Sequence, residues 1–194
     1  MARRRKHPEL TEDTLRALAA SAHQAYLIAA ATHPKTPDDA LYDVFRGEDA
    51  ISYTIRYPEL VVEGGYWQAS IALARRRRLP EDLLLSLAYH DDPEVAEVAL
   101  VHRAVPAWAL HHLAGKDEWR RRAIAANPKC PGDLLDELSH DRERKVLVAV
   151  ASNRNTPVDA LERLSGSEHQ SVRRAVSQNE SATDDIRSVA ALSL

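Results

Sequence analysis

Apolar residues recur in a fixed order after five prolines of the chain. Counted from each proline, they occupy the third, fourth and seventh following positions. This spacing places them on one face of an α-helix. The sets are Ala40, Leu41 and Val44 after Pro37, Leu83, Leu84 and Leu87 after Pro80, Ala109, Leu110 and Leu113 after Pro106, Leu134, Leu135 and Leu138 after Pro131, and Ala160, Leu161 and Leu164 after Pro157. We therefore predict that each proline occupies the first turn of a helix, where its missing N–H group would have no intrahelical partner.

The pattern repeats along most of the chain. Two further copies begin at Thr11 and Thr183, which gives start positions of 11, 37, 80, 106, 131, 157 and 183. A second, shorter apolar piece follows within the unit, at 95–100, 119–124, 146–150 and 172–176. A unit of about 26 residues cannot bury its apolar face alone, so neighbouring units must cover it. The sequence therefore predicts an all-α solenoid.

One spacing, from 37 to 80, is longer than the others. It indicates either a 17-residue insertion or an additional, truncated unit. We favour the truncated unit, because "RYPELV" at 56–61 resembles "HPELT" at 7–11, and we expect "YTIRY" at 53–57 to be its short helical piece. The chain is then a single repeat domain over 1–194 with about eight units: N-terminal units at 7–44, an irregular unit at 45–65 and regular units at 66–194.

The segments "AIAANPKCPGDLLDELSHD", "AVASNRNTPVDALERLSGS" and "VRRAVSQNESATDDIRSVA" resemble the leucine-rich repeat variant (LRV) family. Its repeat reads V-R-x-A-V-A-x-N-P-x-T-P-x-x-L-L-x-x-L-A-x-D. The resemblance is strong over 119–190, fair over 66–118 and 7–44, and poor at 45–65. It implies a right-handed superhelix of alternating α- and 3₁₀-helices, related to HEAT-type solenoids. Members with an iron–sulfur cluster hold it on a cysteine-rich N-terminal segment; this chain has no cysteine before Cys130, and we expect no cofactor.

Composition and charge narrow the function classes. Aromatic residues make up only 5% of the chain, so Ala and Leu carry the burial, which favours short packed helices. A net charge of −3 gives no global attraction to nucleic acid or acidic membranes. The chain shows neither a signal-like apolar run nor 18 uninterrupted apolar residues, and we expect a cytoplasmic protein without a membrane partner. A single cysteine excludes an intramolecular disulfide and a thiolate metal site in one chain.

Basic residues recur two or three positions before the predicted helix starts. Cations ahead of a helix N-terminus are unfavourable for the helix dipole, so the repetition calls for an explanation. A second basic cluster falls on the short apolar piece at 120–122. These candidate binding residues are Lys35, Arg75, Arg76, Arg77, Arg78, Arg103, Arg120, Arg121, Arg122, Lys129 and Arg154. They form either a solvated face, a groove for an acidic protein segment, or a phosphate-binding stripe for nucleic acid, which the scarcity of aromatic residues for base stacking disfavours.

A polar residue stands four positions before each predicted helix start. The column comprises His7, His33, Tyr57, Arg76, His102, Asn127, Asn153 and Asn179. Stacked units would align these side chains as a ladder that satisfies backbone groups at the turns. The alternative is that its His and Arg members line a groove. Thr36 and Thr156, directly before their prolines, are N-cap candidates, and Cys130 fills the same position.

No nucleophile–base set is visible, so the sequence favours a non-enzymatic scaffold for protein–protein interaction, with nucleic-acid binding as the alternative. We interpret His90, His111, His112 and His140 as capping and turn residues rather than metal ligands. Trp108 is expected to be partly exposed and would suit an interface anchor. The apolar end "SVAALSL" permits dimerisation through the last unit.

Overall fold

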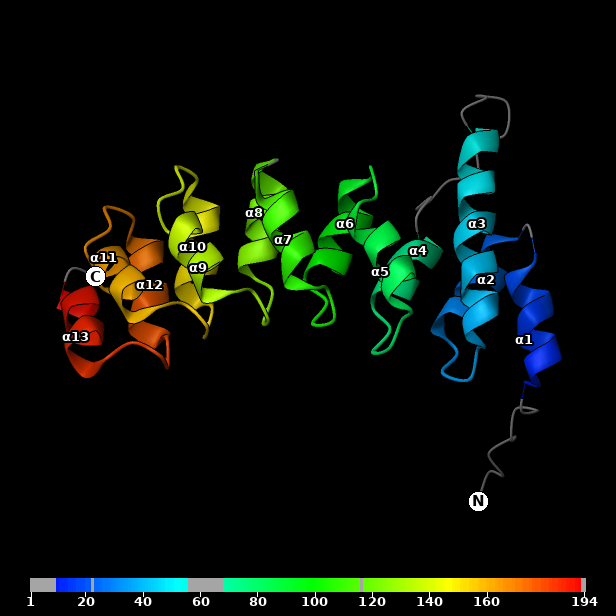
Figure 1. Cartoon of the computed structure of the whole chain (residues 1–194), viewed down its shortest axis with the longest axis horizontal. Coiled ribbons are helices and arrows are strands. Elements are labelled where there is room, and N and C mark those ends of the chain that lie inside the picture. The colour runs from blue at the N-terminus through cyan, green and yellow to red at the C-terminus, as the bar shows by residue number, and fades with distance from the viewer. Residues whose placement is uncertain (1–9, 22, 56–67, 116, 193–194) are drawn as a thin grey trace, which may run out of the picture. The chain divides into compact units, whose positions relative to one another are not determined.

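A computed structural model describes residues 10–192 except 22, 56–67 and 116, and it leaves the side chains of 48–55 and 68 undescribed (Figure 1). The described residues form thirteen α-helices and no strand. The helices are α1 (Glu12–Ala19), α2 (Gln24–Thr32), α3 (Asp38–Ile55), α4 (Gln68–Ala74), α5 (Glu81–Ala88), α6 (Pro93–Leu100), α7 (Ala107–Ala114), α8 (Glu118–Ala125), α9 (Gly132–Leu138), α10 (Arg144–Ser152), α11 (Val158–Ser165), α12 (Gln170–Gln178) and α13 (Asp184–Leu192). The predicted all-α class is confirmed.

The odd-numbered helices begin one residue after the predicted starts. Pro106, Pro131 and Pro157 are N-cap residues, so the prediction that they lie in the first turn is wrong by one position. The carbonyl of Pro131 accepts the first intrahelical hydrogen bond, from the N–H of Leu135 at 3.0 Å. A proline suits this position as well, because an N-cap residue offers its carbonyl to the helix.

The even-numbered helices contain the second apolar piece of each unit. Where the resemblance implies 3₁₀-helices, the described residues form α-helices of seven to nine residues, comparable to most odd-numbered helices. The expectation of alternating 3₁₀-helices is therefore wrong for this part of the chain. Their apolar side chains, such as Val95, Leu100 and Ile124, are fully buried against the units beside them.

The core lies between two layers of helices. All fifteen apolar residues that the proline pattern places on the inner face of α3, α5, α7, α9 and α11 are at most 5% exposed. The even-numbered helices pack on one another, α2 on α4 and α6, α8, α10 and α12 in succession. The described chain divides into two compact units, Met1–Leu83 and Leu84–Leu194, with the division inside α5.

The long spacing between 37 and 80 has a structural basis in α3. This single helix of 18 residues includes 45–55, so these residues form no separate helix. Residues 56–67, with the rest of "YTIRY", lie outside the described part. Because α4 packs on α2 as α12 packs on α10, α3 and α4 make up one unit. The truncated unit at 45–65 stays a prediction, because 56–67 lie outside the described residues.

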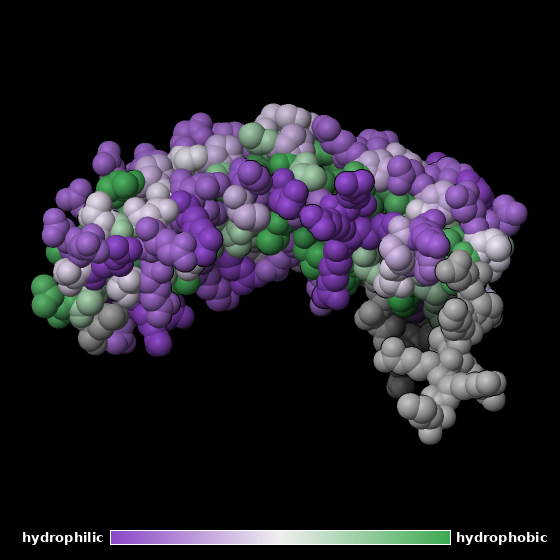
Figure 2. Space-filling view, turned by 90° about the horizontal axis from the view of Figure 1, so that it is seen from below, coloured by the Kyte–Doolittle hydropathy of each residue, from purple (hydrophilic) through white to green (hydrophobic). Residues whose placement is uncertain are grey.

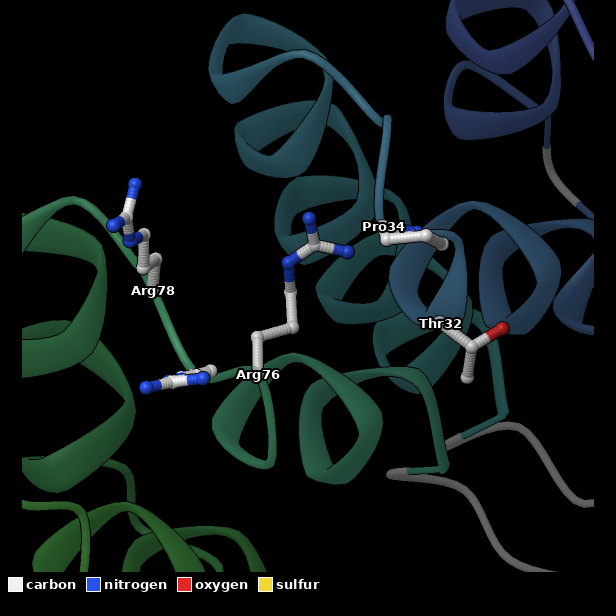
Figure 3. A pocket seen from close by; sticks show the side chains of 5 residues that line it. Thr32, Pro34, Arg76 and Arg78 are labelled. Atoms are coloured by element: carbon white, nitrogen blue, oxygen red, sulfur yellow. The ribbon is translucent and has the colours of Figure 1, made fainter.

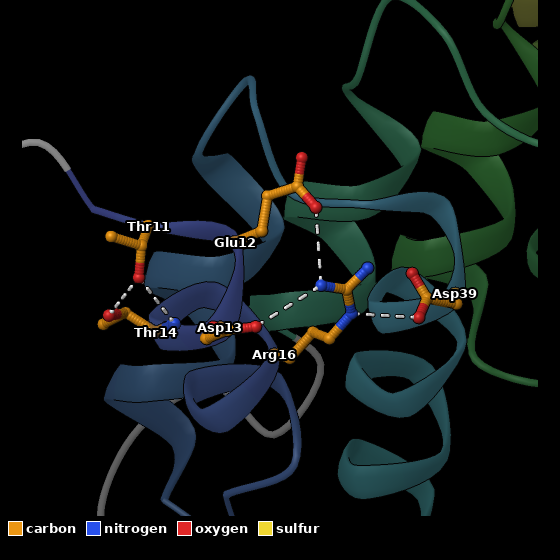
Figure 4. Close-up of polar contacts among 6 residues, drawn as sticks. All are labelled: Thr11, Glu12, Asp13, Thr14, Arg16 and Asp39. Carbon is orange, nitrogen blue, oxygen red and sulfur yellow. Dashed lines mark hydrogen bonds and ion pairs between the residues drawn. The ribbon is translucent and has the colours of Figure 1, made fainter.

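The first unit is held by charge pairs at the start of α1 (Figure 4). Thr11 caps the helix, and its Oγ1 accepts the N–H of Thr14 at 3.2 Å. Arg16 on α1 reaches Asp39 on α3, with 3.1 Å between Nε and Oδ2, and also lies near Glu12 and Asp13. The hydrogen bond from Arg16 lowers the pKa of Asp39 and raises that of Arg16. The acidic first turns thus connect neighbouring helices.

Asparagine side chains link consecutive turns in the second compact unit. Asn127, Asn153 and Asn179 are buried. Asn153 Nδ2 donates to the carbonyls of Ala125 and Asn127 at 2.7 and 2.8 Å, while its Oδ1 accepts the N–H of Asn155 at 2.9 Å. Asn127 and Asn179 make the same three bonds one unit away on either side. These bonds agree with the interpretation that the polar column satisfies backbone groups at the turns.

Arg187 on α13 occupies the position where the earlier odd-numbered helices carry Leu, such as Leu135 and Leu161. Its Nη1 donates to the carbonyl of Asn179 at 3.3 Å, and its Nη2 to Asp184 at 2.6 Å. In the preceding turns the corresponding carbonyls, those of Asn127 and Asn153, accept a hydrogen bond from the asparagine of the next unit. Arg187 therefore satisfies, from within its own unit, an acceptor that a following unit would otherwise use.

Candidate functional site

The basic turn residues follow the C-termini of the even-numbered helices. Helices α2, α4, α6, α8 and α10 end at Thr32, Ala74, Leu100, Ala125 and Ser152. The cations Lys35, Arg75–Arg78, Arg103, Lys129 and Arg154 come within four residues of these ends. The C-terminus of a helix carries a partial negative charge, so cations there are favourable. The turn cations are unfavourable for the helix that follows each turn. The C-terminus of the helix that precedes the turn stabilises them.

Most of these turn cations are exposed to solvent. In the described part of the chain, the side chains of Arg77, Arg78, Arg103 and Lys129 form no hydrogen bond or ion pair. Arg154 pairs with Glu180 at 2.9 Å, but both side chains are largely exposed, at 74% and 70%. Exposed pairs of this kind contribute little to stability, so a ligand carboxylate can displace Glu180. The turn cations are therefore available to a ligand.

Arg76 differs from its neighbours in the run of four arginines at 75–78. Its Nη1 donates to the carbonyls of Ala31 and His33 at 2.7 and 2.8 Å, and burial lowers the pKa of its guanidinium. Arg76 thus makes the two donated bonds that Asn127, Asn153 and Asn179 make in the other compact unit. Its role in the structure is to join consecutive turns, and its guanidinium also lines the hollow described below.

The cluster Arg120–Arg122 on α8 is largely occupied by bonds within the fold. Arg120 replaces the buried Val95, Val146 and Val172 of other units. Its Nη1 contacts Asp117 at 3.1 Å, and its Nη2 donates to the carbonyl of His90 at 3.2 Å. The guanidinium also lies 4.5 Å from the centre of the Trp119 ring.

Arg121 and Arg122 connect α8 to the units on either side. Arg121 Nε binds Asp141 Oδ2 at 2.6 Å, and the Asp141 side chain is only 7% exposed. This hydrogen bond raises the pKa of Arg121. Arg122 Nη2 binds Glu97 Oε1 at 2.7 Å. Three of the predicted binding residues therefore hold helices together, and a ligand would have to break these pairs to reach them.

Hollows lie at the C-terminal ends of the even-numbered helices. One, of about 430 Å³, is lined by Thr32, Pro34, Arg76, Arg77 and Arg78 between the ends of α2 and α4 (Figure 3). The side chain of Arg76 points from the end of α4 toward Pro34, and Arg78 lies further along the same turn. The first compact unit thus presents a concave site with a guanidinium at its edge.

Two adjoining hollows lie in the second compact unit, with volumes of about 430 and 380 Å³. They share Ser152 and Arg154, and together they extend along the turns and ends of α8, α10 and α12. Within 84–194 these turns form the lower side in Figure 1, and the view from below in Figure 2 shows this side to be largely hydrophilic. We call the turns after α6, α8 and α10, with these two hollows, the turn surface.

Sequence reasoning missed part of the lining of this surface. Ser171, Arg174 and Gln178 of α12 line the hollow beside Arg154, and all three are exposed. They are three and four residues apart, which places them on one outward face of the helix. Polar residues at this spacing in the sequence are the signal that indicates such an outward face. None of the three is among the candidate binding residues that the sequence predicts.

No protein-family model matches the chain, and comparisons with curated proteins and with solved structures find no match. No described helix is both long and apolar enough to cross a membrane. Among the described residues, no group of three or more His, Cys, Asp or Glu side chains is placed to hold a metal ion. The site's own chemistry is therefore the basis for a functional proposal.

The remaining candidates have structural explanations. The Nδ1 atoms of His90 and His102 accept the N–H groups of Asp92 and Ala104 at 2.9 and 3.1 Å, which are turn roles as predicted. Burial raises the pKa of the Cys130 thiol to about 12. Thr36 and Thr156 are not N-caps: each hydroxyl donates to the carbonyl six residues earlier, at 2.6 Å. The turn directs these side chains back to the preceding helix.

Exposed apolar residues also occur outside the lining of the two hollows. Trp108 is 57% exposed, as the sequence predicts. The same position in the other repeats is an aspartate in every case: Asp13, Asp39, Asp82, Asp133, Asp159 and Asp185. On α13, Val189 and Leu192 are 50% and 86% exposed.

Proposed function

We propose that this chain is a non-enzymatic scaffold, a right-handed LRV-type α-solenoid of the cytoplasm, that binds an acidic segment of another protein on its turn surface. The observation that carries the proposal is the pair of adjoining hollows that share Arg154, with unpaired Lys129 in the neighbouring turn of the described chain. Repeated α-helix pairs and the LRV-like segments support the solenoid. A buried Cys130 thiol, protonated at neutral pH, supports a role without nucleophilic catalysis.

The chemistry of the surface favours carboxylates as the ligand groups. Arginine and carboxylate form charge-assisted hydrogen bonds that are stronger than neutral ones. Each exposed pair contributes little by itself, so useful affinity requires several cations to engage one segment together. None of the described residues that line the two hollows is aromatic, so nucleic-acid bases would find no stacking platform among them. A protein segment is therefore the preferred partner.

The test compares binding of a labelled acidic peptide and of single- and double-stranded nucleic acid at about 50 and 200 mM salt. The variant Arg103→Gln/Lys129→Gln/Arg154→Gln removes the turn cations. The control Arg142→Gln/Arg144→Gln/Lys145→Gln removes as much charge from exposed residues ahead of and at the start of α10. We expect the first variant to lose peptide binding and the control to keep it.

Two results would overturn the proposal. Tight nucleic-acid binding that weakens steeply with salt and disappears in the first variant would make the phosphate backbone the ligand. Equal loss of peptide binding in both variants would show attraction to overall charge rather than to the turn surface.

Association between copies through the last unit is part of the proposal, supported by the exposed Val189 and Leu192. Sedimentation of the protein and of Leu192→Ser tests it. A concentration-dependent dimer that the substitution abolishes is expected, and a monomer at all concentrations would refute this part.

A further inference from the structure

The spacing of the turn cations is set by the asparagine ladder. Asn127 donates to the carbonyl of His102, Asn153 to that of Asn127, and Asn179 to that of Asn153, at 3.1, 2.8 and 2.9 Å. Each turn is therefore in direct contact with the next. Packed helices lie about 8–10 Å apart. Arg103, Lys129 and Arg154 follow the ladder residues by one or two positions, so the surface presents about one exposed cation in every 8–10 Å.

This spacing matches one extended conformation of a polypeptide. A polyproline II helix has three residues per turn and rises about 3.1 Å per residue, so every third side chain lies on the same side about 9.3 Å further along. A β-strand returns to the same face after about 6.6 Å, which does not match. An α-helix returns after seven residues and about 10.5 Å, but it is about 10–12 Å wide. Hollows of about 430 and 380 Å³ suit the thinner segment.

The groups beside the cations suit the same conformation. A polyproline II helix has no internal hydrogen bonds, so its carbonyls remain free to accept. The amide of Gln178 and the hydroxyl of Ser171 line the hollow beside Arg154 and are donors of the required kind. Both belong to α12 and are exposed. The surface thus offers cations for side chains and neutral donors for the backbone.

Glu180 marks the end of the row of cations. It follows Asn179 as Arg154 follows Asn153, so it occupies the corresponding position one unit later. A ligand carboxylate at that position would meet a like charge. The cations of Arg103, Lys129 and Arg154 therefore correspond to three acidic residues in the ligand.

We infer that the turn surface of 84–194 binds a polyproline II segment of a partner protein. This segment carries an acidic residue at every third position over three turns of its own helix. This inference rests on the proposed function and adds the conformation and spacing of the ligand. Such a segment loses little conformational entropy on binding, because it already populates the bound form.

The experiment uses two labelled peptides of the same composition and the full chain. One repeats Glu-Pro-Pro three times; the other places its three glutamates at every second position and the remaining prolines after them. We expect fluorescence anisotropy to show at least about tenfold tighter binding of the first, because only its carboxylates reach all three cations together. Glu180→Gln should strengthen its binding by releasing Arg154, and Arg154→Gln should weaken it.

The outcomes separate the two levels of the proposal. Equal affinity for both peptides, lost in Arg154→Gln, would overturn the spacing and leave an acidic-segment scaffold in place. Absence of binding to either peptide and to other acidic peptides would overturn both. Unchanged affinity in Glu180→Gln together with unchanged affinity in Arg154→Gln would remove the turn surface as the binding site.

Discussion

The side-chain amide of Asn153 donates to the backbone carbonyl of Asn127 at 2.8 Å, while the side chain of Asn127 performs the same task for the turn before it. A buried asparagine thus forms hydrogen bonds with three backbone groups at each turn and fixes the distance between neighbouring turns. The asparagines of the polar column are therefore structural residues that hold the turns of the turn surface together.

Asn153→Ala should destabilise the protein by about 3 kcal/mol, because two carbonyls and one N–H group lose their partner in a buried site. Urea denaturation followed by circular dichroism measures the free energy of unfolding. Asn155→Ala is the matched comparison. Asn155 is exposed, its Nδ2 donates to the carbonyls of Pro128 and Cys130 at 3.0 and 3.3 Å, and the loss of these solvent-accessible bonds should cost about 1 kcal/mol or less. Similar losses in the two variants would contradict the ladder.

Arg76 and Arg77 are adjacent arginines with different expected roles. Arg76→Ala should cost about 2 kcal/mol, because the carbonyls of Ala31 and His33 lose charge-assisted bonds. Arg77→Ala should change stability by less than about 0.5 kcal/mol, since its side chain is exposed. Hydrogen exchange of α2 and α4 reports the difference locally. Equal protection of these helices in both variants would show that Arg76 is not a ladder residue.

Stability at extreme pH should depend on Tyr42 and Asp82. The Tyr42 hydroxyl donates to Asp82 Oδ1 at 2.6 Å, which lowers the pKa of Asp82 and raises that of Tyr42. The contribution is fully present between the ordinary pKa values of about 4 and about 10. It is lost as pH falls through the lowered pKa of Asp82, and as pH rises through the raised pKa of Tyr42.

Tyr42→Phe removes this contribution at both ends of the pH range. Thermal unfolding between about pH 2 and pH 11 should show a flatter profile for Tyr42→Phe than for the unmodified protein. Tyr26→Phe, at an exposed tyrosine on α2, is the control and should leave the profile unchanged. Identical profiles for all three proteins would refute the prediction.

Cys130 should resist alkylation in the folded protein. Its thiol is buried and its pKa of about 12 leaves little thiolate at about pH 8, so labelling should follow unfolding. Cys130→Thr should be stable to within about 1 kcal/mol, because a threonine hydroxyl at the same position in two other turns donates to the carbonyl six residues earlier. Mass spectrometry of alkylated protein checks the first statement. Rapid labelling without denaturant would contradict it.

Trp108→Asp introduces the residue that the same position holds in the other repeats. We expect a change of less than about 0.5 kcal/mol in stability, since the indole is 57% exposed and an acidic residue suits the first helical turn. Leu110→Asp, two residues on and fully buried, should unfold the second compact unit. A large loss of stability in Trp108→Asp would show that the indole is part of the core.

The helix starts and inner faces were predictable because proline and apolar spacing are local signals. The ion pairs were not, since Arg121–Asp141 and Arg122–Glu97 join residues 20 and 25 positions apart and depend on how neighbouring units are staggered. Thr156 directly precedes a helix in the sequence, which predicts an N-cap. In the structure its hydroxyl instead donates to the carbonyl of Val150. The sequence lacks a local stop signal that would separate α3 from a new unit, so the length of this helix was not predictable.

Arg187 has a consequence for building longer versions of this protein. By using the Asn179 carbonyl and replacing the inner-face leucine, it makes α13 a poor foundation for another stacked repeat. Extra copies of a repeat such as 131–156 should therefore be introduced directly after 156, between α10 and α11, where every added asparagine has a turn before it to donate to and a turn after it to accept from. Arrays extended there would lengthen the surface in steps of one repeat, each bringing another turn and another place for a cation.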